Sequence, residues 1–108
     1  MSNVYKFKGV ALATSSETSL LTASSNETLI LKSIRVTNNT SNTPTLSFDV
    51  ADSSASAEYT ILKTQTLAAN TGVEILSVPL VLEASDALKA TVSSSDSVHF
   101  GISYMSVT

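Results

Sequence analysis

Short runs in which apolar and polar residues alternate recur along the chain, and this period of two limits the fold more than any other feature. The clearest run closes the sequence, where His99, Gly101 and Ser103 lie between the apolar positions Val98, Phe100, Ile102 and Tyr104. A second run places Leu46, Phe48 and Val50 on one face, and a third does so with Leu88, Ala90 and Val92. Alternation of this kind is typical of half-buried β-strands. No apolar pattern with a period of 3.6 residues extends over a helical length.

The longest strand-like run is ETLILKSIRVTN, residues 27–38, and its alternation is imperfect. Ile30, Ile34 and Val36 share one parity, whereas Leu29 and Leu31 share the other. Two explanations remain open: the strand is buried on both faces near its start, or a β-bulge switches the buried face partway along it.

Polar turn clusters separate the runs and set the expected number of strands. The cluster NNTSNTP, residues 38–44, contains a proline that ends the central run. Pro79 divides the apolar segment 73–83 into two short pieces, so we expect one of them at a sheet edge. We predict an all-β protein: a single antiparallel β-sandwich, jelly-roll-like, with eight to nine short strands in one domain over residues 1–108.

Hydroxyl residues take the place of charged ones, since the chain has 20 Ser and 14 Thr but only 14% charged residues. A Ser/Thr-rich chain could be disordered. Disorder, however, requires low hydrophobicity and high net charge, and this chain is 43% hydrophobic with a net charge of −3. We therefore interpret the hydroxyls as the solvent faces and turns of a folded β-protein.

Charge and residue usage disfavour several classes of function. Only six Lys and Arg residues are present and they form no cluster in the sequence, which argues against a nucleic-acid partner. The chain has no cysteine, which excludes disulfides, thiol catalysis and zinc–thiolate sites. We expect no signal peptide at the N-terminus, and no apolar run approaches the 18 residues or so of a membrane span.

The residues that could support chemistry do not form a recognised motif. The single histidine, His99, falls on the outward face of the last strand, where a surface or interface role is the simpler explanation. Asp49, Asp52, Asp86 and Asp96 could bind calcium together with loop carbonyls, but without a diagnostic spacing we expect them to be solvated turn carboxylates. We predict no catalytic residue, no metal site and no cofactor.

Aromatic residues are few and include no Trp, which gives little support to carbohydrate stacking. We expect four of them to serve as core or interface anchors, with a core position favoured for the last: Tyr5, Phe7, Tyr59 and Tyr104.

Four segments together resemble a known family: residues 20–40, residues 48–76, residues 78–96 and VHFGISYMSV at residues 98–107. In this order they are similar to the small β-sandwich virion proteins of tailed bacteriophages, including marine and cyanobacterial phages. The resemblance implies a structural protein present in many copies on a particle assembled in the host cytoplasm. It carries no functional residues over to this chain.

We therefore expect a non-enzymatic virion protein that oligomerises and packs on the capsid, neck or tail as a cement, decoration or attachment component. Its partners would be copies of itself and other virion proteins, with no nucleic acid and no membrane. The alternative is a small receptor- or glycan-binding module of a phage fibre. The lead segment, residues 1–14, is a candidate arm that pairs with a neighbouring subunit.

Overall fold

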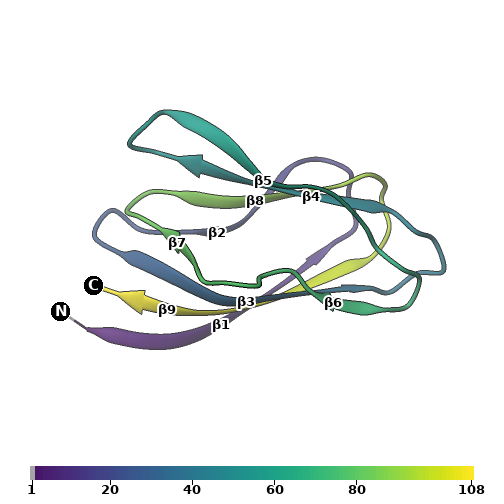
Figure 1. Cartoon of the computed structure of the whole chain (residues 1–108), viewed down its shortest axis with the longest axis horizontal. Coiled ribbons are helices and arrows are strands. Elements are labelled where there is room, and N and C mark those ends of the chain that lie inside the picture. Colours follow the sequence, from purple (N-terminus) through teal and green to yellow (C-terminus); the bar gives the residue numbers. More distant parts are fainter. Residues whose placement is uncertain (1) are drawn as a thin grey trace.

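The computed structural model describes residues 2–108, and they form two antiparallel β-sheets packed face to face (Figure 1). The nine strands of this region are β1 (Asn3–Leu12), β2 (Thr18–Thr22), β3 (Thr28–Asn38), β4 (Thr45–Asp52), β5 (Ala57–Thr66), β6 (Gly72–Glu74), β7 (Leu80–Leu82), β8 (Ala87–Val92) and β9 (Val98–Val107). The predicted all-β sandwich with eight to nine strands is confirmed. Among the described residues, no helix is long and apolar enough to cross a membrane.

The strand order is that of a jelly roll. Sheet A has the order β1-β9-β3-β6, with β7 also paired to β3, and sheet B has the order β2-β8-β4-β5. The chain passes from one sheet to the other between most successive strands. If β6 and β7 are taken as one interrupted strand, each sheet has four strands, as in two interlocked Greek keys.

A β-bulge at Lys32 resolves the ambiguity in the central run. The pairing of β3 with β9 shifts by one residue between Leu31 and Ser33. Leu29 and Leu31 are therefore buried before the bulge, and Ile34 and Val36 are buried after it. The second of the two explanations is correct, and Ile30 consequently lies on the outer face of sheet A.

The core contains the apolar residues that alternation predicted on the inner faces. Fully covered side chains from sheet A include Leu31, Ile34, Val98 and Ile102, and those from sheet B include Leu46, Phe48, Leu88 and Val92. Tyr104 is only 9% exposed, which confirms the core position expected for it. Each fully buried aliphatic or aromatic side chain contributes about 1.5–3 kcal/mol through removal from water.

Strand β1 lies in the segment considered as a subunit-exchanging arm. It forms the edge of sheet A and pairs with β9 of the same chain along its whole length, from Asn3–Val107 to Leu12–Val98. The main chains of Ser2 and Thr108 extend this pairing with two hydrogen bonds of 2.8 and 2.9 Å, so the ends of the chain lie side by side (Figure 1).

The opposite edge of sheet A is interrupted, as Pro79 suggested. Glu74 is the last residue of β6, and its carboxylate satisfies main-chain groups where the strand pairing stops. It accepts hydrogen bonds from the Ser33 hydroxyl and from the main-chain N–H of Ile34 (2.8 Å) and Leu76 (3.2 Å). Burial acts to raise the pKa of Glu74, but these hydrogen bonds outweigh it and hold the pKa below its ordinary value.

Buried polar side chains fix the loops at the ends of the sandwich. Asn38 is fully buried, and its amide nitrogen lies within hydrogen-bond distance of the carbonyls of Asn42, Leu67 and Ala68. At the other end the Asp86 carboxylate accepts main-chain N–H groups from Ser53 (2.9 Å) and Glu83 (3.0 Å). Because it is only 5% exposed, the expectation that Asp86 is a solvated turn carboxylate is wrong.

Candidate functional site

Three surface features bring together residues that could bind a ligand or a partner. They are a group of carboxylates on sheet B, a hollow on the outer face of sheet A, and an apolar cleft between the sheets along one edge. None of them was visible as a sequence motif, because each combines residues from strands that are far apart in the chain.

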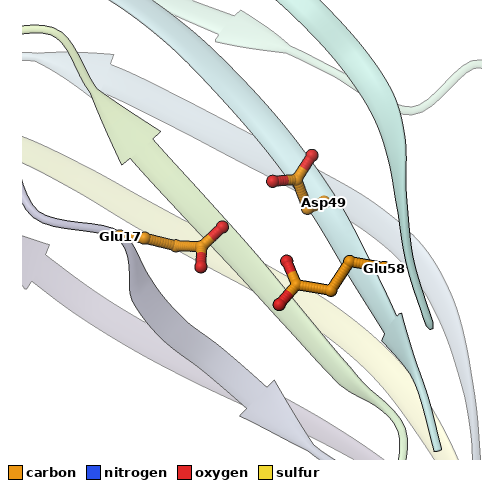
Figure 2. A group of neighbouring side chains, drawn as sticks. All are labelled: Glu17, Asp49 and Glu58. Carbon is orange, nitrogen blue, oxygen red and sulfur yellow. The ribbon is translucent and has the colours of Figure 1, made fainter. Parts of the chain in front are cut away.

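The carboxylate group consists of Glu17, Asp49 and Glu58, which point toward one another from the loop before β2, from β4 and from β5 (Figure 2). One oxygen from each lies within 4.8 Å of the other two. Of the four aspartates considered from the sequence, this group includes only Asp49. The two glutamates were missed because the pairing of β2 with β8, β8 with β4 and β4 with β5, not sequence spacing, brings them close.

Lys89 of β8 lies within this group and supplies its positive charge. Its ammonium is 3.2 Å from Glu58 Oε2 and 4.0 Å from Glu17 Oε1. A hydrogen bond with Asp49 is the main cause that raises the pKa of Glu17; burial and the nearby Glu58 charge add to it, and Lys89 opposes it. The arrangement is a group of three carboxylates beside a lysine, at a partly exposed site where each ion pair contributes little.

Asp52 and Asp96, the remaining two of the four aspartates considered from the sequence, accept hydrogen bonds from loop residues. Asp52 accepts the Ser54 hydroxyl at 2.8 Å within its own turn. Asp96 accepts hydrogen bonds from the Ser94 hydroxyl (2.6 Å) and the Asn42 amide (2.9 Å), which together hold its pKa below the ordinary value. They anchor turns at opposite ends of the sandwich, and neither belongs to the carboxylate group that includes Asp49.

The hollow on sheet A has a volume of about 510 Å³ and contains His99 on its wall. Its floor is the directly paired Gly9 and Gly101, and Phe7 lies over both glycines. A methyl group added to Gly101 would come within 3.1 Å of the Phe7 ring, so the ring rests against the bare main chain. Arg35 and Thr37 line the opposite side. His99 is exposed, as predicted, and the residues that line the hollow include no carboxylate to orient it.

The cleft between the sheets has a volume of about 220 Å³ and lies between β5 and the β6–β7 segment. Ile61, Leu62, Leu76 and Val78 line it, together with the core residues Ile34 and Phe48. With Ile61 41% exposed and Val78 69% exposed, this edge of the sandwich presents apolar side chains to solvent.

Comparisons with known proteins show the fold of the chain but no family. No protein-family model and no curated protein matches it. Among solved structures, a Bacillus endospore appendage protein, described as belonging to a novel family of disulfide-linked pili, is similar with a TM-score of 0.61 and 9% sequence identity. That match covers 96% of this chain and 87% of the other.

A second similar structure is that of Clostridium thermocellum endo-1,4-β-D-xylanase 10B, which holds the CBM22-1 and GH10 modules and was solved with xylohexaose. The TM-score is 0.51 and the identity 16%; the match covers 98% of this chain but spans only 25% of the xylanase chain. At these identities the two likenesses show a shared β-sandwich fold.

Proposed function

We propose that this protein is a non-enzymatic structural protein of a tailed-bacteriophage particle, which oligomerises and packs on the capsid, neck or tail as a cement, decoration or attachment component. It would act in the assembled virion, after assembly in the host cytoplasm. Its partners would be further copies of itself and other virion proteins.

The distribution of exposed apolar side chains carries this proposal. Large apolar residues are exposed on the outer strands of the sandwich instead of surrounding a deep cavity: Val4, Tyr5 and Phe7 on β1, Tyr59 and Ile61 on β5, and Val78 and Val81 beside or on β7. Exposed apolar patches on small proteins often mark sites of contact with other molecules, other proteins among them. The few charged groups leave these surfaces easy to desolvate.

The comparisons support the broader part of the proposal. The similar structures are a pilus protein and a chain with a carbohydrate-binding module, so the shared fold is used there for assembly or binding. The phage assignment itself rests on the resemblance of residues 20–107 to virion proteins. Pili of the Bacillus protein are disulfide-linked, a link that this cysteine-free chain cannot form, so its own assembly would depend on non-covalent contacts.

Locating the protein in particles tests the proposal directly. We expect mass spectrometry of purified particles to detect the chain in many copies, and gold-labelled antibodies to place it at one position on intact particles by electron microscopy. Its absence from purified particles, when it is present in the infected cell, would overturn the assignment.

One observation favours a second candidate, a glycan-binding module. Tyr5 and Phe7 are 76% and 70% exposed on the same face of β1, and Phe7 presents the free side of its ring above the glycine floor. An exposed, immobilised aromatic ring can stack on an apolar sugar face. Calorimetric titration with xylohexaose, repeated with Phe7→Ala, tests this: saturable heat lost in the variant supports glycan binding, and no heat with either protein counts against it for this sugar.

A further inference from the structure

The outer face of sheet A carries an apolar row that crosses four of its five strands, β1, β9, β3 and β7. The register pairs Tyr5 of β1 with Met105 of β9, Met105 with Ile30 of β3, and Ile30 with Val81 of β7. Directly paired residues point to the same side of a sheet, and the strand neighbours of Met105 and Ile30 are buried in the core, so these two residues and their partners Tyr5 and Val81 face outward. Tyr5 is 76% exposed and Val81 52% exposed. We call this set the apolar row: Tyr5, Met105, Ile30 and Val81.

Four residues further along β1, a second row has a contrasting shape. Gly9 pairs with Gly101, Gly101 with Arg35, and Arg35 with Glu74. Half of this row lines the hollow beside Phe7, and the other half carries the exposed Arg35. We call it the glycine row: Gly9, Gly101, Arg35 and Glu74.

From these two rows we propose that the outer face of sheet A binds the same face of a second copy of this chain, around a two-fold axis that runs parallel to the strands between β9 and β3. The proposal deepens the proposed function, because it rests on self-assembly and names the surface that mediates it.

The symmetry makes both rows complementary to themselves. A two-fold axis along the strands keeps each residue's position along the strand and reverses the order of the strands. Tyr5 then lies over Val81 of the second copy, and Met105 lies over Ile30 of the second copy, so the apolar row is covered end to end. This is an isologous contact, in which each residue pair occurs twice.

The glycine row fits in the same arrangement. Arg35 of one copy lies over Gly101 of the other, so its guanidinium enters the hollow of about 510 Å³ and meets the free face of Phe7. Arginine stacks favourably on aromatic rings. Arg35 on one half of the row thus faces, on the other copy, a hollow with Phe7 as its aromatic wall.

Charge favours this face over the other surfaces for self-association. Arg35 is paired across the strands with Glu74, so the two charges of the glycine row balance on each copy. The outer face of sheet B carries the Glu17, Asp49 and Glu58 carboxylates around Lys89, and stacking two such faces would bring these acidic groups together. The β1 edge is also unsuitable, because antiparallel pairing of two copies about Phe7 would place Lys6 opposite Lys8.

Cross-linking tests the proposed symmetry, and because the chain has no natural cysteine, only the introduced cysteines can react. Tyr5→Cys and Val81→Cys are prepared as separate proteins, mixed, allowed to exchange and treated with a short bismaleimide. We expect covalent dimers from the mixture and few from either protein alone. Dimers from each protein alone, or none from the mixture, would overturn the arrangement. A mixture of Tyr5→Cys with Thr60→Cys, on β5 of sheet B, is the matched control and should not cross-link.

Light scattering on the unmodified protein supplies the second measurement. We expect a mass of twice 11.3 kDa, and we expect Tyr5→Lys to raise the dimer dissociation constant by about tenfold or more, as for an aromatic anchor at an interface. Tyr59→Lys, at a 54% exposed position on β5, should leave it unchanged.

The two proposals fail in different ways. A monomer at all concentrations, or an oligomer unaffected by Tyr5→Lys, overturns the sheet A contact, while detection of the chain in purified particles would still support the virion role. A dimer with the expected cross-links in a chain absent from particles would overturn the virion role alone.

Discussion

Phe48 of sheet B and Phe100 of sheet A meet edge to face between the two sheets, with ring centroids 6.0 Å apart and an interplanar angle of 84°. Both rings are at most 2% exposed, so this contact lies in the middle of the core. Phe100 is also the neighbour of His99 and Gly101, whose outer side forms part of the hollow on sheet A. The same strand thus holds the core on one face and the proposed contact surface on the other.

Substitutions that remove the Phe48 ring should be among those that destabilise the fold most. We expect Phe48→Ala to lower the free energy of unfolding by about 3–5 kcal/mol, because it removes a large apolar side chain and leaves a cavity. Urea denaturation followed by circular dichroism measures this. A double-mutant cycle of Phe48→Leu with Phe100→Leu should give a coupling energy of about 0.5–1.5 kcal/mol, and zero coupling would show that the edge-to-face geometry adds nothing to burial.

The Asp86 carboxylate should contribute more to the stability of the fold than a carboxylate in an exposed turn. Asp86→Ala leaves the main-chain N–H groups of Ser53 and Glu83 without their acceptor, and we expect a loss of about 1–3 kcal/mol in the free energy of unfolding. Asp52→Ala is the matched control in the neighbouring loop, where the partner hydroxyl is exposed, and it should cost much less. Equal effects in a chemical denaturation series would contradict the role given to Asp86.

Acid should destabilise the fold through Glu27 and Glu74. Hydrogen bonds from Ser106 and Ser24 lower the pKa of Glu27, and those from Ser33, Ile34 and Leu76 outweigh burial to lower the pKa of Glu74. A depressed folded-state pKa means that each ionised carboxylate stabilises the protein above the unfolded pKa of about 4.3, and that this stability is lost as the pH falls through the folded-state value.

Glutamine variants at Glu27 and Glu74 test whether these carboxylates cause the predicted loss of stability at low pH. We expect Glu27→Gln and Glu74→Gln to be less stable than the parent at pH 7 and to lose less stability between pH 5 and 2.5 or so. Thermal unfolding across this range gives the slopes. Glu83→Gln serves as the comparison, and a parent protein whose stability does not fall with acid would contradict the assignment.

Glu17, in the carboxylate group on sheet B, should change the stability of the fold with pH in the opposite direction. Because the pKa of Glu17 is raised, the folded state holds its proton more tightly than the unfolded chain does, so Glu17 destabilises the fold at neutral pH and this cost is relieved as the pH falls. We expect Glu17→Gln to raise the melting temperature slightly at pH 7 and Lys89→Met to lower it. Both shifts should shrink in 1 M salt or so, where exposed charges are screened. Salt-independent shifts would indicate packing effects instead.

Much of the fold could be predicted because alternation survives tertiary packing. The inner faces of β4, β8 and β9 are the apolar parities of the sequence, and Pro79 marked the broken edge where β6 and β7 lie. The anchor role of Tyr104 followed from the same pattern. The position of Asp86 did not, since a residue in a polar turn gives no sign that its carboxylate folds back beneath main-chain amides.

The sequence by itself determined the class of fold, the faces of most strands and the absence of disulfide chemistry, because a period of two and the count of cysteines are local properties. Only the tertiary structure decided which strands are neighbours and in what register. The bulge at Lys32 turns Ile30 outward, where it aligns with Tyr5, Met105 and Val81 from three other strands. Cross-strand rows of this kind, like the group of Glu17, Asp49 and Glu58, depend on long-range pairing, which alternation within single strands does not encode.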